Sequence, residues 1–222
     1  MVLGIDARVF TYACHVLAVV SAVLVLVWCI DYRGGLAFKA TNKQLIFNVH
    51  PVLMLIGFVI IGSEAIISYK ALPFRKAVKK LIHLVLHTIA LVLGAVGIYA
   101  VFKYHDEIGI ANLYSLHSWF GLGTICLYSI QWIFGFIVFF FPGGTPSLQS
   151  GALPWHRVFG LFVYALALAT VELGFLEKLT FLHNSGLDKY GSEAFLVKFN
   201  AIAVVLFGSL VVLATISAPR VN

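Results

Sequence analysis

The residues of this chain best suited to chemistry are four histidines, each near one end of a separate long apolar segment: His50, His83, His117 and His156. An imidazole inside a lipid bilayer is costly and marks a functional site that has a partner. In a chain that crosses a membrane back and forth, alternate segments begin on opposite sides. His50 and His117 are therefore expected near one face, and His83 and His156 near the other.

Two imidazoles at the same depth on facing helices are what a six-coordinate haem iron needs. The pattern predicts two bis-histidine haems, one near each membrane face. The chain has no Cys-x-x-Cys-His motif, so haem b without covalent attachment is expected. His87 shares a helix face with His83 and is the alternative ligand. Depth favours His83, because it enters its segment about as far as His156 enters its own.

The elements that must position these histidines are membrane-spanning helices. Hydrophobic residues make up 61% of the 222 residues and charged residues 11%, against about 25% charged in soluble domains. About 20 apolar residues cross a bilayer core of about 30 Å. We expect one all-α membrane domain, residues 1–222, with six transmembrane helices: Val9–Ile30, Leu45–Ile67, Leu81–Phe102, Ser115–Phe141, Trp155–Leu176 and Phe195–Ser217.

The basic residues indicate the orientation of the chain. They stand at segment ends, where they set topology and meet lipid headgroups, so the net charge of +6 does not indicate a nucleic-acid partner. The short loop between the second and third segments holds a concentration of them: Lys70, Arg75, Lys76, Lys79 and Lys80. The positive-inside rule therefore predicts that this loop, the His83/His156 pair and both termini face the cytosol.

Other polar residues receive weaker expectations. His105 is expected in the loop after the third segment, beside the His50/His117 pair, which makes it a candidate for a substrate site. His15 has no matched partner at its depth, and Glu64 is expected to extend its carboxylate toward the headgroups. Four glycines fall on the helix faces that carry the histidines and are expected to make room for flat haem rings: Gly57, Gly94, Gly121 and Gly160.

Several motifs together resemble the cytochrome b561 family over essentially the whole chain. They are Asn48-x-His50-Pro51, Lys80-x-x-His83-x-x-x-His87, Tyr104-His105, the run Asn112-Leu113-Tyr114-Ser115-Leu116-His117-Ser118-Trp119, and Trp155-His156. The resemblance implies that the second to fifth helices form a bundle around two b haems, with the first and last helices outside. It also implies the pairs His50 with His117 and His83 with His156, in agreement with the depth argument.

The resemblance further implies a transmembrane oxidoreductase of the ferrireductase type. Such proteins oxidise cytosolic ascorbate and pass single electrons to monodehydroascorbate or ferric chelates on the far side. Lys76, Lys79 and Lys80 would form a cationic mouth for the ascorbate anion, with Lys80 as the leading catalytic candidate. His105, also a catalytic candidate, would edge the far-side pocket with Asn112 and Tyr114. Some family members use an arginine before the fifth helix, but residues 143–153 contain none.

The resemblance favours an endomembrane, vacuolar or of secretory vesicles, over the plasma membrane, and a homodimer. Two other classes of protein are weighed against it. A quinone-linked dihaem cytochrome b carries two histidines about four turns apart on each of two helices, and no segment here has such a pair. A non-haem transporter with histidine relays is expected to show broken helices and inverted repeats, which this sequence does not suggest.

Overall fold

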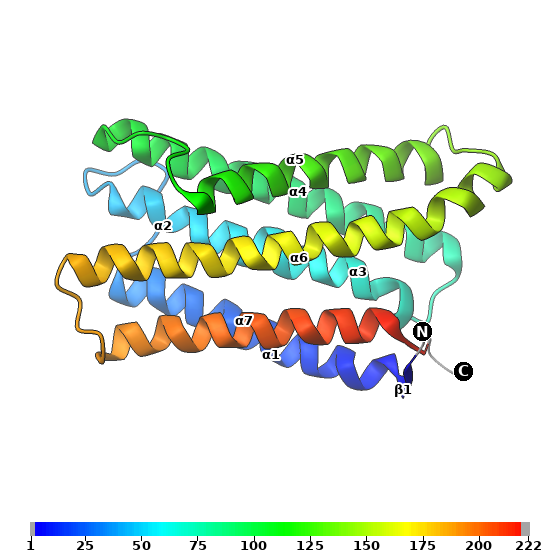
Figure 1. The fold of residues 1–222 in the computed structure, drawn as a ribbon, viewed down its shortest axis with the longest axis horizontal. Coiled ribbons are helices and arrows are strands. Elements are labelled where there is room, and N and C mark those ends of the chain that lie inside the picture. The colour runs from blue at the N-terminus through cyan, green and yellow to red at the C-terminus, as the bar shows by residue number, and fades with distance from the viewer. Residues whose placement is uncertain (1–2, 219–222) are drawn as a thin grey trace.

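The computed structural model describes residues 3–218, and nearly all of them belong to helices that run along one common axis (Figure 1). In chain order these are α1 (Ala7–Val27), η1 (Trp28–Tyr32), α2 (Gln44–Val52), η2 (Leu53–Ile60), α3 (Ile61–Ala71), α4 (Lys76–Ile108), α5 (Leu116–Phe139), α6 (Pro146–Asn184) and α7 (Ser192–Ile216). Here η1 and η2 are π-helical turns that continue α1 and join α2 to α3. Two short strands, β1 (Leu3–Asp6) and β2 (Ser217–Ala218), pair in parallel.

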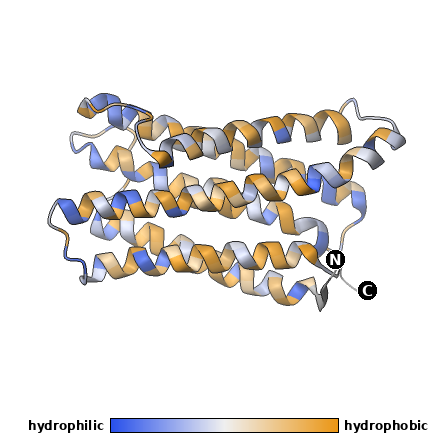
Figure 2. Cartoon of the chain, viewed as in Figure 1, coloured by the Kyte–Doolittle hydropathy of each residue, from blue (hydrophilic) through white to orange (hydrophobic). Residues whose placement is uncertain are grey.

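The apolar surface of the helices matches a membrane protein. Hydrophobic residues dominate the middle of the bundle, and hydrophilic residues gather toward its two ends (Figure 2). Within the described residues, six helices are long and apolar enough to cross a bilayer, which confirms the prediction of six spans in an all-α protein. The described residues begin with β1 and end with β2, which pair with each other at one end of the bundle.

Helices α1 and α7 form a layer of their own beside the other four spans (Figure 1). The buried residues of α1 recur at alternating spacings of four and three: Ala7, Thr11, Cys14, Ala18, Ser21 and Val25. This spacing places one continuous stripe against α7, as in a coiled coil. Where α7 meets α6, a Cβ on Gly208 would come within 2.3 Å of Leu168, so the absence of a side chain there sets the close approach.

The second span is interrupted next to its histidine. The sequence suggests that Pro51 lies within the first turns of the span, where proline is tolerated; in the structure it is the last residue but one of α2. Proline lacks an N–H, and its ring excludes the carbonyl one turn earlier, so the regular α-helical pattern cannot continue through it. The π-helical segment η2 follows directly. Such π segments often mark functional sites, and this one begins three residues after His50.

Two helices extend farther than the apolar segments that reveal them. Helix α4 continues to Ile108, so His105 lies in its last turn and not in a loop, and the helix ends at Gly109 in a left-handed conformation with φ of 72°. Helix α6 begins at Pro146, capped by Thr145, and ends at Asn184. The expected loops on either side of this span are therefore mostly helical. Hydropathy marks the bilayer crossing, whereas capping residues mark the helix end.

Polar side chains between the helices are paired in ways that the sequence does not reveal. His15 of α1 lies 3.0 Å from the Glu64 carboxylate of α3, a partner that the sequence does not reveal. Asn48 directs its amide nitrogen at the carbonyl oxygens of Cys29, Arg33 and Gly35, at 3.3, 3.1 and 2.8 Å. It thereby anchors the loop between the first two spans beside the helix that carries His50.

Candidate functional site

The structure brings the four histidines together in the two pairs expected from their depths. The ring centroids of His50 on α2 and His117 on α5 are 6.1 Å apart, with an angle of 86° between the rings. Those of His83 on α4 and His156 on α6 are 6.2 Å apart, at 69°. Each pair therefore joins two different spans, and the two pairs use four consecutive spans of the chain.

These separations fit an iron atom between the two rings of each pair. An imidazole nitrogen binds a metal ion at about 2 Å and lies about 1.1 Å from its own ring centre, so two rings on opposite sides of one iron have centroids about 6.2 Å apart. Direct ring stacking would bring the centroids closer together. The residues present therefore fit a bis-histidine haem at each pair.

The outer nitrogen of three of these rings has a backbone partner. Nδ1 lies 2.9 Å from the Gly97 carbonyl oxygen in His50, 2.8 Å from that of Ala65 in His83, and 2.9 Å from that of Thr170 in His117. A carbonyl oxygen only accepts, so Nδ1 carries the proton and donates it. Nε2 is then left bare for a metal, which is the usual outer-shell arrangement of a ligating histidine.

His156 differs, because its outer partner is a side chain. The amide nitrogen of Gln131 lies 2.9 Å from His156 Nδ1 and donates to the His156 carbonyl oxygen at 2.7 Å. Gln131 lies on α5, the helix that packs against α6. It therefore holds both the ring and the backbone of His156 in place.

Glycine makes room for the histidine rings, but at positions other than those suggested by sequence. A Cβ on Gly174 would come within 2.8 Å of His117 Cε1, and one on Gly135 within 3.1 Å of His156 Cε1. Among the four glycines expected to face a haem, Gly57 and Gly94 instead make room for side chains of neighbouring helices. A Cβ on Gly57 would come within 2.6 Å of Leu93, and one on Gly94 within 2.8 Å of Phe58. That expectation is wrong for these two, because a helix buried on several faces uses glycine for helix packing as well.

A cavity surrounds the His50/His117 pair. It holds about 1500 Å³ of empty space, its open mouth included, and side chains from α2, η2, α4, α5 and α6 line it. Gly121 and Gly174 lie in its wall, and Met54 and Phe58 contribute to its apolar interior. The open mouth and the apolar wall suit a flat hydrophobic cofactor with a polar edge.

The predicted far-side residues gather at this mouth. His105 Nδ1 lies 3.0 Å from the Asn112 side-chain oxygen, and the His105 and Tyr114 ring centroids are 6.4 Å apart. Partial burial raises the pKa of the Tyr114 hydroxyl, and the nearby Glu177 and Tyr104 act in the same direction. His105 and Tyr114 both line the cavity, so three residues chosen from sequence lie together in space.

Sequence reasoning missed a second group at the same cavity. Lys178 Nζ lies 3.8 Å from the centre of the Phe47 ring, and the Phe47 and Tyr104 rings are 5.3 Å apart. Gln44 donates to the Tyr104 hydroxyl at 2.5 Å, and its side-chain oxygen lies 3.4 Å from Lys178 Nζ. Phe47 lies one turn before His50 and is the one sequence signal that could have indicated this group.

At the opposite end, two of the three predicted lysines also hold helix ends. Lys79 Nζ donates to the Tyr69 carbonyl oxygen at 3.1 Å, and Lys80 Nζ to that of Phe139 at 2.5 Å. Lys76 is exposed at the start of α4. The ring of Phe139 lies 5.2 Å from that of His156, and the ring of Tyr69 lies 5.2 Å from that of His83. Each bound carbonyl therefore belongs to a residue that touches a paired histidine.

His87 takes a different position from the four paired histidines. Its ring centroid lies 4.3 Å from that of His83, and its Nδ1 lies 2.5 Å from the Tyr128 hydroxyl. The ring that faces His156 is that of His83. His87 therefore backs the pair from one turn deeper, in contact with both His83 and Tyr128.

The helices and histidines described above define a multi-spanning helical membrane protein with a facing histidine pair near each end of a four-span bundle. Comparison with known proteins is consistent with this class. The model of the family "Eukaryotic cytochrome b561" matches residues 49–182. The chain belongs to the cytochrome b561 family, for which haem b is the implied cofactor.

Related proteins match along most of their length. The chain is 70% identical to a probable ascorbate-specific transmembrane electron transporter 1 of Oryza sativa subsp. japonica, covering 100% of this chain and 95% of that protein. It is 66% identical to transmembrane ascorbate ferrireductase 1 of Arabidopsis thaliana, over 96% and 89%. It is 39% identical to transmembrane ascorbate-dependent reductase CYB561 of Sus scrofa, over 83% and 72%.

Proposed function

We propose that this chain is a transmembrane oxidoreductase that takes single electrons from ascorbate on the cytosolic side and delivers them across the membrane through two b haems. The ring separations of 6.1 and 6.2 Å carry this proposal, because both match one iron held between two imidazoles. The named relatives, which are ascorbate-dependent transporters and reductases, support the substrate. Bound haem supplies one-electron redox chemistry, and the protein orients it and tunes its potential.

The axial ligands we propose are His50 with His117 and His83 with His156. His87 is not a ligand in this proposal, because its ring lies against His83 and its Nδ1 against Tyr128. Ascorbate would bind at the His83/His156 end, where Lys76, Lys79 and Lys80 supply positive charge to an anion. Lys80 would draw the anion toward Phe139, whose ring touches His156.

At the far end, His105, Asn112 and Tyr114 would receive the acceptor, monodehydroascorbate or a ferric chelate. The hydrogen bond between His105 and Asn112 holds the imidazole at the mouth of the cavity that contains His50 and His117. The concentration of basic residues in the α3–α4 loop supports cytosolic termini. We further propose an endomembrane location, vacuolar or of secretory vesicles, and a homodimer, both by analogy with the family.

The test is the haem content of the purified chain in detergent. A pyridine haemochrome assay combined with a protein assay is expected to give two haems per chain, and His117→Ala is expected to give one, with the remaining haem still reduced by ascorbate. His183→Ala is the matched control, because His183 lies near the end of α6 in no pair, and should keep two. A wild-type ratio of one, or loss of ascorbate reduction in His117→Ala, would contradict the ligand pairs and their sidedness.

A further inference from the structure

A lysine lies in the wall of the far-side cavity, where an apolar lining would be expected. Lys178 is half-buried on α6 and lines the cavity that holds His50 and His117. Its ammonium group is held over the face of Phe47, 3.8 Å from the ring centre, and faces the Gln44 side-chain oxygen at 3.4 Å. An aromatic face attracts a cation, so this group is held in one place.

Lys178 has no acidic partner, in contrast to three other basic residues at the same end. Lys43 and Lys103 both pair with Glu107, and Arg33 pairs with Glu193. No carboxylate of residues 3–218 lies within ion-pair distance of Lys178 Nζ. Glu177 also lines the cavity, but its carboxylate does not pair with Lys178. A half-buried cation with only an aromatic face and an amide oxygen has unused capacity for an anion.

Lys178 is also close to the paired histidines. The Phe47 ring that holds it has its centroid 6.4 Å from that of His50. The Lys178 ammonium group therefore lies no farther from the His50 ring than the sum of these two short distances. A charge at such a range, inside an apolar wall, acts more strongly than it would in water.

We propose that Lys178 is an anion site for a carboxylate inside the far-side cavity, and this inference rests on the proposed function. Two sources of carboxylate fit the chemistry. One is a propionate of the haem held by His50 and His117, which Lys178 would neutralise. The other is a carboxylate of the acceptor, such as that of a ferric chelate, which Lys178 would draw toward His50.

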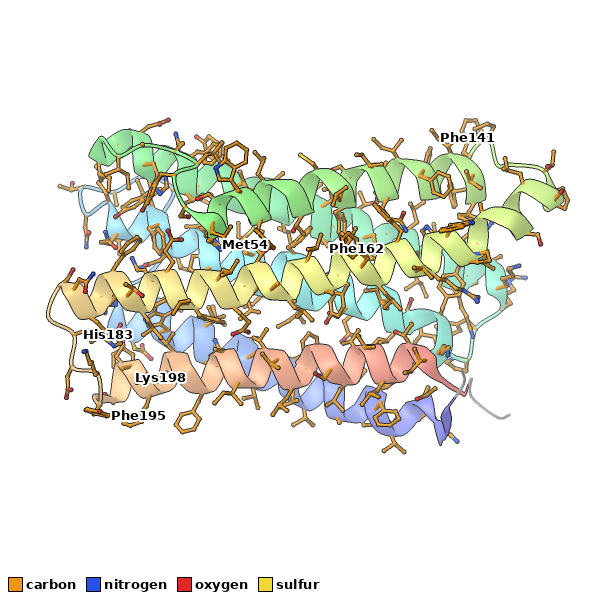
Figure 3. The ribbon with its side chains drawn as sticks, viewed as in Figure 1. Met54, Phe141, Phe162, His183, Phe195 and Lys198 are labelled. Atoms are coloured by element: carbon orange, nitrogen blue, oxygen red, sulfur yellow. The ribbon has the colours of Figure 1, made fainter. Side chains whose placement is uncertain are left out.

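The test compares Lys178→Met, Lys178→Arg and the control Lys198→Met in the full-length protein in detergent. Lys198 lies at the same end, on α7 (Figure 3), and is likewise held near aromatic rings, with Nζ 5.3 Å from the Phe195 ring centre. It does not line the cavity. Redox titration of the far-side haem is carried out in a His156→Ala background, where it is the one expected to remain. Steady-state reduction of ferric citrate and of neutral ferric maltol is measured without that substitution.

Each source predicts its own result. If Lys178 holds a propionate, Lys178→Met shifts the ratio of reduced to oxidised far-side haem on the order of tenfold toward oxidised at fixed ambient potential, and Lys178→Arg restores it. If Lys178 binds the acceptor, the potential stays and the KM for ferric citrate rises several-fold, while that for ferric maltol does not.

Two results would overturn the inference. One is that Lys178→Met behaves like Lys198→Met in both measurements. The other is an equal loss of haem in Lys178→Met and Lys178→Arg. That result would show that the lysine side chain is needed for its shape and that its positive charge plays no part. A wild-type protein without two haems would instead contradict the proposed function itself, whatever the Lys178 variants show.

Discussion

At the scale of single residues, the atoms behind the histidine rings decide how firmly each ring is held. Gly97, Ala65 and Thr170 offer backbone carbonyl oxygens, which no side-chain substitution removes. His156 is instead held by a side chain, because the Gln131 amide nitrogen donates to its Nδ1 and to its carbonyl oxygen. The His83/His156 site can therefore be loosened by one substitution that leaves all four proposed ligands in place.

We expect Gln131→Leu to loosen the His156 ring and to weaken haem binding at the His83/His156 pair by about tenfold, the usual effect of losing a hydrogen bond, and to leave the other haem unchanged. Haem retention during dilution and the low-spin electron paramagnetic resonance signal of each haem measure this. Gln149→Leu is the matched control, because its amide donates to Gly144 away from any histidine. Equal haem retention in both variants would show that Gln131 does not support His156.

A second residue-scale prediction concerns Lys80. Removing a charge beside an anion site costs about 1–3 kcal/mol, so Lys80→Ala should slow reduction by ascorbate while both haems stay bound. Lys80→Arg should keep part of the rate, since it can still donate to the Phe139 carbonyl. Stopped-flow reduction at several ascorbate concentrations measures the effect, with exposed Lys39→Ala at the far end as control. Unchanged kinetics in Lys80→Ala would show that Lys80 does not take part in ascorbate binding and only stabilises the end of α5.

The sequence was sufficient to predict the histidine pairs and the His105 group, because each of these residues stands near one end of an apolar segment and the order of the spans sets the depth of that end. It could not indicate Lys178 or Gln131. Their partners, Phe47 and His156, belong to other spans, and contact between them depends on helix rotation. Hydropathy along one helix carries no information about its rotation against a neighbour. The depth of a residue in the membrane was therefore predictable, but the side chain that it contacts on another span was not.

At the scale of the helices, two glycines determine how closely the histidine-bearing helices approach their neighbours. Gly174 of α6 faces His117 of α5, and Gly135 of α5 faces His156 of α6, so each of these two helices places a glycine against a histidine of the other.

The irregular turn after Pro51 was not predictable from hydropathy, because an apolar π-helical segment and an apolar α-helix have the same composition. Motif resemblance likewise gave no sign of it.

We expect Gly174→Ala to displace the His117 ring, because the new methyl group would lie 2.8 Å from His117 Cε1. The far-side haem should be lost or show a shifted low-spin signal, while the other haem is unchanged. Gly123→Ala is the control on α5, where a Cβ would meet nothing within 4 Å, and it should add about 0.5–1 kcal/mol of stability. Absorption and electron paramagnetic resonance spectra of the purified variants measure this. Identical spectra in both variants would contradict the steric role of Gly174.

At the scale of the whole molecule, α1 and α7 are fastened to each other by polar contacts at the far end. Glu193 of α7 is buried and accepts hydrogen bonds from Trp28 Nε1, at 2.9 Å, and from Arg33. Cys14, Ser21 and Val25 of α1 are fully buried in the same layer. Val25 and Trp28 also line the cavity around His50 and His117, whereas Glu193 does not, so this layer contributes both to stability and to the wall of the site.

We expect Glu193→Ala to destabilise the protein by about 3–5 kcal/mol, because it leaves the partly buried Arg33 without its counter-charge. The spectra of both haems in the folded fraction should be unchanged. Thermal unfolding in detergent, followed by circular dichroism, measures the loss. Glu107→Ala removes an exposed carboxylate that pairs with Lys43 and Lys103, and should change the midpoint little. A similar midpoint for both variants would contradict a fastening role for Glu193.

The carbonyl bonds to His50, His83 and His117 have a consequence for how the protein is made. These rings take their orientation and tautomer from carbonyl oxygens of the protein itself, so we expect a newly inserted chain to present the nitrogens proposed to bind iron before any cofactor arrives. The conformational entropy of these histidine side chains is therefore lost when the protein folds in the membrane and not when haem binds. In cells starved of haem, we therefore expect this protein to accumulate as a folded, colourless apoprotein that turns red when haem is supplied, with no new synthesis.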